Sequence, residues 1–319
     1  KMMEYDPTSQ KYGWIPASCV TGDRYACRRW NKSNATPIGE AVGNLDYLRN
    51  LPTLLGLGAY LVDNNHGRRK LSPTNHYKFA TGDTAALDGS MGHYQWGWAT
   101  KWYIAFWTEG NYFYEAVKAG SPIKGRWNYE IPIASMSATG CGIMDNTNMK
   151  LVSYINNGAQ YRGGNNDSAK DAAFNTLLGR AATCHTPAEW QTYAAKNGSG
   201  WYGALGRFIA AYSVLIDVIF GTWNHQTAYN ASKDSNNLYQ GGLGRGVCDF
   251  GKWDTFGYFP FIPTSSGIEL ADACGYVNVT VTYSDGTTTT VPVPSFFGLK
   301  HPFGYIFKQT VDETAQKLS

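Results

Sequence analysis

The sequence predicts a mixed α+β protein in which two to three helices pack on small twisted antiparallel sheets connected by long loops. Glycine clusters with aromatic neighbours occur at 158–166, 239–246 and 256–263. They indicate loops, because glycine adopts backbone conformations that other residues avoid. Helical patterns lie between the first two clusters. Residues 276–291 alternate with a period of two on either side of Ser284-Asp285-Gly286, which predicts a β-hairpin.

The N-terminal part is predicted to be a smaller, β-rich region. Residues 1–90 contain many Gly, Asn, Asp and Pro residues and are interpreted as irregular, apart from a short apolar piece at 54–62. Turns are expected at 64–67 and 87–90, because Asn, Asp and Gly tolerate positive φ angles.

Two aromatic runs follow this stretch, at 93–107 and 112–114. Aromatic density favours β-strands, and Glu109-Gly110-Asn111 between the runs predicts a hairpin turn. A short strand is expected at 131–134. We place a domain boundary near Asn128, which gives a β-rich region at 1–127 and a second domain at 128–319.

Three helices are expected in the second part. The first spans about 167–178, and the third spans about 204–223 with a wide apolar face. The second begins at Thr186-Pro187-Ala188-Glu189, which supplies an N-cap, a first-turn proline and a capping-box glutamate. That helix is expected to end at Asn197-Gly198.

Composition and charge exclude several classes of protein. Charged residues make up 16% of the 319 residues, below the roughly 25% usual in soluble proteins. The net charge is only +3 and no basic run exceeds Arg68-Arg69-Lys70, so we expect no nucleic-acid partner. The longest apolar run, 208–220, is shorter than the roughly 20 residues of a membrane span. Low charge with many Trp, Tyr and Asn residues suits extracellular, virion or carbohydrate-facing proteins.

Cofactor and metal motifs are not found. The six histidines lack H-x-x-x-H spacing and the six cysteines form no C-x-x-C pair. Asn165-Asn166-Asp167 could bind calcium, but a helix cap is the favoured interpretation. Gly241–Gly246 lacks the Lys-Ser/Thr of a phosphate loop and is interpreted as a turn. We expect no cofactor and no metal, with buried thiols favoured over disulfides.

Catalytic motifs are equally sparse. There is no G-x-S-x-G elbow. Five carboxylates could pair in space as in a glycosidase: Glu189, Asp217, Asp249, Asp254 and Glu269. Any chain of this size offers such candidates, so a non-enzymatic protein is the expectation and a glycan-active enzyme the less favoured alternative.

Ligand binding by aromatic side chains is the favoured function. Several aromatic residues lie beside turn residues rather than inside apolar runs, and Tyr and Trp give a large contact area at low entropic cost. Arg207, off the apolar face of the third helix, completes the set. The predicted ligand-binding residues are Trp201, Tyr202, Arg207, Trp223, Asn224, His225, Tyr239, Trp253 and Tyr258. The alternative for each aromatic residue is a place in the core beneath a long loop.

The order of motifs along the chain resembles one family. The motifs are Tyr161-Arg162-Gly163-Gly164-Asn165, Leu178-Gly179-Arg180, Asn197-Gly198-Ser199-Gly200-Trp201, Tyr239-Gln240-Gly241-Gly242-Leu243-Gly244, Gly257-Tyr258-Phe259-Pro260-Phe261-Ile262-Pro263 and the closing Ser295–Ile306. The chain is similar to the C-type-lectin-fold variable proteins of gut-bacterial phages and prophages, which are often associated with diversity-generating retroelements. The resemblance covers most of the chain, above all 128–310.

This resemblance implies a C-type-lectin-like scaffold, also described as formylglycine-generating-enzyme-like, with a display region at about 198–258. It implies a receptor-binding or variable protein at a virion tail or fibre, or at a cell surface. Its partners would be a bacterial surface glycan or protein and other virion subunits, in a homo-oligomer. A structural head or tail decoration protein is the main alternative.

Two properties of related proteins are not carried over. The Glu-Pro-Asn, Gln-Pro-Asp and Trp-Asn-Asp triplets of calcium-dependent animal lectins are missing, and Trp223-Asn224-His225 comes nearest but ends in histidine. The cysteines also lack the paired arrangement of a formylglycine-generating enzyme. The resemblance therefore implies neither calcium-dependent sugar binding nor catalysis.

Overall fold

The computed structural model confirms a mixed α+β protein with several small antiparallel sheets. It describes residues 2–6, 11–15, 23–156, 158–161, 185–229, 232, 267–282, 288–302 and 310. The chain forms two compact units, each assembled from separate stretches. Unit 1 comprises 1–57, 98–134 and 208–228, and unit 2 comprises 58–97, 135–207 and 229–319. The single boundary expected near Asn128 falls within the second stretch of unit 1 and stays a prediction.

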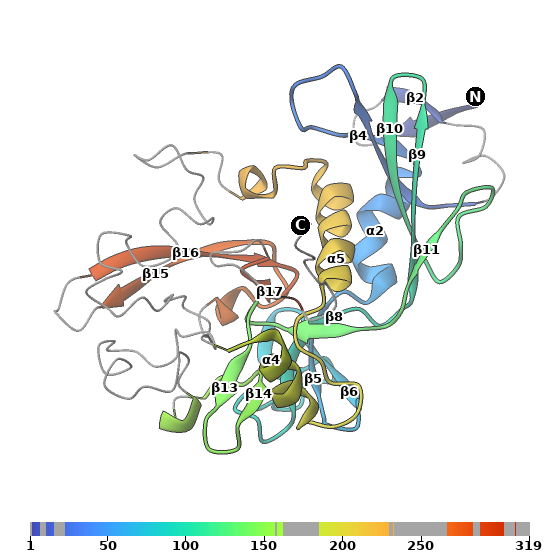
Figure 1. Ribbon diagram of the computed structural model, residues 1–319. Helices are drawn as coiled ribbons and strands as arrows, with labels where there is room; N and C mark the ends of the chain where they lie inside the picture. Colours follow the sequence, from blue (N-terminus) through green and yellow to red (C-terminus); the bar gives the residue numbers. More distant parts are fainter. Residues whose placement is uncertain are drawn as a thin grey trace, which may run out of the picture. The chain divides into compact units, whose positions relative to one another are not determined.

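A five-stranded antiparallel sheet forms the frame of unit 1 (Figure 1). Its strands, in spatial order, are β11 (Tyr129–Ile131), β9 (Trp102–Glu109), β10 (Tyr112–Ala119), β3 (Ala26–Asn31) and β4 (Glu40–Gly43). The turn predicted at 109–111 is confirmed, because Glu109 pairs with Tyr112 and Gly110 has a φ of 56°. A separate pair, β1 (Met2–Asp6) and β2 (Lys11–Ile15), belongs to the same unit.

The two faces of this sheet differ. One face carries a core of small and aromatic side chains: Tyr25, Cys27, Ala105, Tyr114, Ala116 and Ile123. Cys27 is buried there, as predicted for a thiol that acts as a small hydrophobe, whereas Cys274 in unit 2 is exposed. Because side chains alternate along a strand, the opposite face carries Ile104, Phe106, Phe113 and Glu115.

A helix that the sequence did not predict packs on β3 and β10. Helix α2 (Leu45–Leu55) begins at Asn44, whose side chain accepts a hydrogen bond from Tyr47 N, and it ends at Gly56 with a φ of 65°. Leu48, Leu51 and Leu55 are its buried residues. The helix is short, contains Pro52 and lies between turn residues. For these reasons its sequence resembles that of a loop.

The prediction of an irregular stretch at 1–90 was therefore wrong. It contains α2 and seven strands, among them β5 (Gly58–Val62), β6 (Arg68–Ser72) and β7 (Asn75–Phe79). Each strand there has only four to six residues, too few to show a clear alternation. The predicted turn at 64–67 is confirmed, because Asp63 Oδ1 accepts from Asn65 N and Gly67 N between β5 and β6.

Unit 2 contains the second five-stranded sheet, in the order β12-β8-β5-β6-β7. Its central strands β5 and β8 (His93–Gly97) are buried along their whole length. Strand β12 (Ser135–Ser137) and β11 lie on either side of the strand predicted at 131–134. That prediction was wrong in position, because Pro132 has no N–H for a sheet ladder.

Smaller elements complete unit 2. They are β13 (Ile143–Asp145) paired with β14 (Lys150–Val152), the turns η1 (Ala159–Tyr161) and η4 (Ile268–Leu270), and the sheet of β15 (Gly275–Thr282), β16 (Thr288–Phe296) and β17 (Leu299–Lys300). The β15–β16 hairpin was predicted and is confirmed. The helix predicted at 167–178 lies outside the described residues.

The other two predicted helices are confirmed. Helix α4 (Pro187–Ala195) has the complete capping box formed by Thr186 and Glu189. Helix α5 (Gly206–Phe220) is shorter than the predicted 204–223, because Gly221 follows it with a φ of 69°. A turn, η2 (His225–Ala228), comes next. Among the described residues, no helix combines the length and apolar character needed to cross a membrane.

Candidate functional site

A continuous row of aromatic rings lies across the strands of the unit 1 sheet. This aromatic row consists of Trp127, Tyr129, Phe106, Phe113, Trp223 and Trp30. Centroids of successive rings along the row are separated by 3.9, 6.1, 6.0, 6.1 and 4.9 Å. Rings at such separations contact one another, so the row is contiguous from Trp127 to Trp30.

Sheet register explains how distant parts of the sequence contribute to the row. Phe113 on β10 is paired with Trp30 on β3, and cross-strand partners project from the same face. Phe106 on β9 is paired with Glu115, two residues from Phe113, and therefore shares that face. Tyr129 on β11 is paired with Ile104, two residues before Phe106. The aromatic row thus crosses four of the five strands.

Four members of the row are exposed to solvent: Trp127 (68%), Tyr129 (48%), Trp223 (46%) and Phe106 (38%). Trp30 is buried and stacks beneath Trp223 with an interplanar angle of 10°. A gathering of exposed large apolar side chains marks an interaction surface more often than scattered single residues do. The aromatic row is such a gathering.

Charged side chains gather beneath Trp223. This Glu115 cluster comprises Glu115, Asp217, His225 and Arg28. The Trp223 indole Nε1–H donates to Glu115 Oε2 over 3.4 Å, and His225 Nε2 lies 2.8 Å from Asp217 Oδ1. Glu115 is only 6% exposed, so its carboxyl group lies within the fold with one long hydrogen bond from the row.

The environment of Glu115 disfavours its ionised form. Burial raises its pKa most, and the nearby Asp217 carboxylate raises it further. The hydrogen bond from Trp223 acts in the opposite direction, but the net pKa is about 8. Glu115 is therefore mainly protonated at neutral pH.

Arg28 does not neutralise this carboxyl group, although it is the cross-strand partner of Glu115. Its guanidinium instead donates from Nε to Val218 O at 2.8 Å and from Nη2 to Ile219 O at 3.1 Å. These carbonyls lie at the C-terminal end of α5, which favours a cation. A Cβ on Gly221 would lie 2.9 Å from Arg28 Cζ, so glycine permits this close approach.

Backbone pairing fixes the position of Trp223. Its N–H donates to Pro37 O at 3.0 Å, and Gly39 N donates to Gly221 O at 2.8 Å. Residue 38 forms a bridge with Thr222 between these two bonds. The segment after α5 is thus attached to the 37–39 loop, and the Trp223 ring is held between Trp30 and Glu115.

Three predicted binding residues lie together in this segment of unit 1. Trp223 is a member of the aromatic row. Asn224 instead shapes the turn, because its Oδ1 accepts from Thr227 N at 3.4 Å and its carbonyl accepts from Thr227 Oγ1 at 2.7 Å. His225 pairs with Asp217. Only Trp223 of the three presents a large exposed surface.

Three more predicted residues lie in unit 2. Trp201 Nε1 donates to Asn64 O at 3.3 Å, and its ring packs 4.3 Å from His93, between centroids. Tyr202 and Arg207 are exposed. Trp201 therefore packs within unit 2, and its role in ligand binding stays a prediction. The Tyr202 side chain, in contrast, is exposed. Tyr239, Trp253 and Tyr258 lie outside the described residues.

Most of the aromatic row was missed by sequence reasoning. Phe106 and Phe113 lie in aromatic runs that were interpreted only as strands, and Trp127 lies beside the predicted domain boundary at Asn128. The hairpin turn at 109–111 carried the missing signal, because it fixes the register that places Phe106 and Phe113 on one face.

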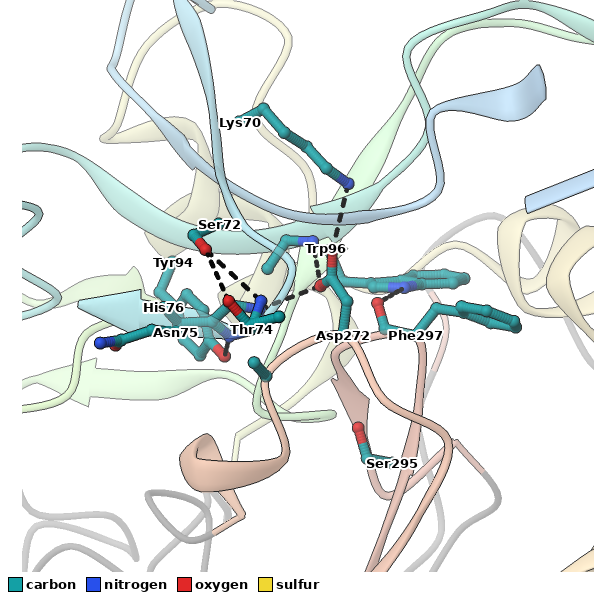
Figure 2. Close-up of polar contacts among 12 residues, drawn as sticks. Lys70, Ser72, Thr74, Asn75, His76, Tyr94, Trp96, Asp272, Ser295 and Phe297 are labelled. Carbon is teal, nitrogen blue, oxygen red and sulfur yellow. Dashed lines mark hydrogen bonds and ion pairs between the residues drawn. The ribbon is translucent and has the colours of Figure 1, made fainter. Parts of the chain in front are cut away.

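Unit 2 contains a second polar group, which Figure 2 shows in close-up. This Asp272 cluster comprises Asp272, His76, Lys70 and Tyr94. Asp272 Oδ1 accepts from Ala59 N at 3.0 Å and from His76 Nε2 at 2.9 Å, and Lys70 Nζ lies 3.4 Å from Oδ2. Because Nε2 donates, His76 Nδ1 accepts from the Tyr94 hydroxyl, 2.6 Å away.

The order Asp272–His76–Tyr94 superficially resembles a catalytic triad, in which a carboxylate orients a histidine toward a hydroxyl. His76 and Tyr94 are completely buried, however. Burial lowers the pKa of His76, which favours the neutral ring required by this pattern of hydrogen bonds. A group without access to solvent cannot meet a substrate, so the Asp272 cluster ties the 271–274 segment to the sheet of unit 2.

Comparisons with protein-family models, curated proteins and solved structures found no match. Within the described residues, no three His, Cys, Asp or Glu side chains are grouped in a way that could hold a metal ion. The geometry of the two clusters and of the aromatic row is therefore the basis for a functional proposal.

Proposed function

We propose that this chain is a non-enzymatic ligand-recognition protein and that the aromatic row of unit 1 is its principal contact surface. The observation that carries the proposal is the contiguity of the aromatic row along one face of the unit 1 sheet, with four of its six rings exposed. Aromatic rings supply large contact areas while losing little side-chain entropy. Strand pairing holds them in place before binding, which lowers the entropic cost of association.

We further propose a C-type-lectin-like scaffold and a role as a phage or prophage receptor-binding or variable surface protein. The order of the glycine and aromatic motifs supports this assignment, together with the low charge content. The ligand is a bacterial surface glycan or protein. The protein acts at a virion tail or fibre or at a cell surface, as a homo-oligomer with other virion subunits as partners.

Binding of the fluorescently labelled protein to a panel of intact gut bacteria tests this function. We expect binding to a few strains, abolished by periodate if the ligand is a glycan and by protease if it is a protein. Absence of binding by the folded protein at micromolar concentration would contradict the proposal. A stable trimer or larger assembly without cell binding would instead favour a structural head or tail decoration protein.

One observation favours a second candidate, a glycan-active enzyme. Glu115, mainly protonated at neutral pH, and the neighbouring Asp217 form a carboxyl pair, and glycosidases use one neutral and one ionised carboxyl group. Both side chains are buried, so a substrate would reach them only if Trp223 moved aside. Release of reducing ends from bacterial polysaccharide, lost in Glu115→Gln, would establish this activity. Binding without release would exclude it for the polysaccharides tested.

A further inference from the structure

Trp223 connects the exposed surface of unit 1 with its buried charges. Its ring covers Trp30 and contacts Phe113, while its indole N–H donates to Glu115. Among the described residues, no other member of the aromatic row donates a hydrogen bond to the Glu115 cluster. A change in the protonation state of Glu115 therefore affects the aromatic row through Trp223.

The groups around Glu115 favour one protonation state. Arg28 approaches from β3, but its guanidinium is bound to α5 carbonyls. Asp217 approaches from α5 and carries the same charge as an ionised Glu115. His225, from the segment after α5, is paired with Asp217, and β9 contributes Phe106 at the paired position. An ionised Glu115 would therefore lie beside a like charge, with Trp223 as its single described donor.

We propose that the Glu115 carboxyl is a proton-dependent latch on the aromatic row: neutral, it remains buried beneath Trp223, and ionised, it admits water and displaces Trp223. The displacement disrupts the end of the row formed by Trp223 and Trp30. This inference rests on the proposed function, because it concerns the regulation of the same surface. It makes ligand binding stronger at neutral pH than in alkaline solution.

Opposing effects determine whether ionisation of Glu115 holds Trp223 in place or displaces it. The hydrogen bond from Trp223 strengthens when Glu115 is ionised, because charge-assisted hydrogen bonds are stronger than neutral ones. Burial and Asp217 disfavour that ion and outweigh the bond, since the net pKa of Glu115 is raised to about 8. Opening of the site lets water solvate the ion, whereas the closed site does not.

Fluorine NMR of the full chain labelled with 5-fluorotryptophan measures the response of Trp223 to pH directly. Trp223→Phe identifies the Trp223 resonance among those of the 11 tryptophans. We expect that resonance to shift with a midpoint near the pKa of Glu115 as the pH is raised, while the other resonances report that the protein stays folded. In Glu115→Gln, an uncharged side chain of the same shape, the resonance should not titrate.

Asp217→Asn supplies a second test, because its amide oxygen still accepts from His225 while the like charge is gone. The midpoint should move to lower pH. A Trp223 resonance that stays constant in the wild type, or titrates equally in Glu115→Gln, would overturn the latch. Cell binding that fails at every pH, with the wild-type resonance still titrating and the Glu115→Gln resonance constant, would overturn the proposed function alone.

Discussion

Each of the two units buries a carboxyl group, but the two groups differ in the hydrogen-bond donors and charges that surround them. Asp272 in unit 2 receives Ala59 N, His76 Nε2 and Lys70 Nζ within 3.4 Å. Among the described residues, Glu115 in unit 1 receives a single hydrogen bond, from the indole N–H of Trp223 at 3.4 Å, and it lies near Asp217. The cation available to it, Arg28, is engaged by the carbonyls of α5.

This difference separates a structural group from one that can respond to pH. A buried carboxylate with several donors is stabilised as an ion and locks the segments that supply them. A buried carboxyl group with few donors stays neutral and becomes costly when it ionises. The first arrangement lies in a closed interior, and the second lies beneath the exposed aromatic row.

Removing Asp272 should have the largest effect on stability. Asp272→Ala removes the carboxylate that accepts from the fully buried His76 and lies 3.4 Å from Lys70 Nζ, and we expect the free energy of unfolding to fall by about 3–5 kcal/mol. Urea denaturation measures this loss. Asp46→Ala is the matched control, because the Asp46–Arg49 pair is exposed and such pairs contribute less than about 1 kcal/mol. Equal effects of the two substitutions would contradict the structural role of the Asp272 cluster.

Glu115→Gln should change the pH dependence of stability. The folded-state pKa of Glu115 is raised from 4.5 to about 8, so the wild type is most stable below the lower value and loses stability as the pH rises through the higher one. The loss is up to about 5 kcal/mol across this window, because each pKa unit corresponds to about 1.4 kcal/mol. Denaturation series at several pH values should show the loss in the wild type and a flatter profile in Glu115→Gln. Parallel profiles would show that Glu115 is not the titrating group.

A pair of glycine substitutions tests how tightly the Asp272 cluster is packed. Gly58 and Gly275 have similar φ values, 143° and 148°. A Cβ on Gly58 would lie 2.1 Å from Lys70 Nζ and 2.2 Å from Asp272 Oδ2, whereas one on Gly275 meets nothing within 4 Å. Gly58→Ala should therefore cost about 1–3 kcal/mol more than Gly275→Ala. Equal melting temperatures for the two variants would show that Lys70 and Asp272 can move to accommodate the added Cβ at little cost in stability.

Local chemistry made part of this fold predictable. The capping box at Thr186 and Glu189 and the hairpin turn at 109–111 depend on neighbouring residues, and both are confirmed. The strands before residue 80 were missed because each is short and flanked by turn residues. Helix α2 was missed because Pro52 and the glycines around it indicate a loop when no tertiary contacts are known.

The candidate site was less predictable, because long-range contacts define it. Arg28 contacts Val218 across 190 positions, and His76 contacts Asp272 across 196. Sequence reasoning identified Trp223 from its neighbouring turn and included Asp217 among the carboxylates that could pair. It could not place Glu115 beside Asp217, because their proximity follows from tertiary contacts of α5 with β3 and β10.

Cell binding by variants of the aromatic row tests the central claim most directly. Trp127→Ala combined with Phe106→Ser removes two exposed rings from the row, and Tyr77→Ala removes an exposed ring from unit 2 as the control. We predict that the double variant loses binding to the bacterial strains recognised by the wild type while its melting temperature stays within a few degrees, and that Tyr77→Ala binds normally. A folded double variant that binds as tightly as the wild type would contradict the assignment of the aromatic row as the recognition surface.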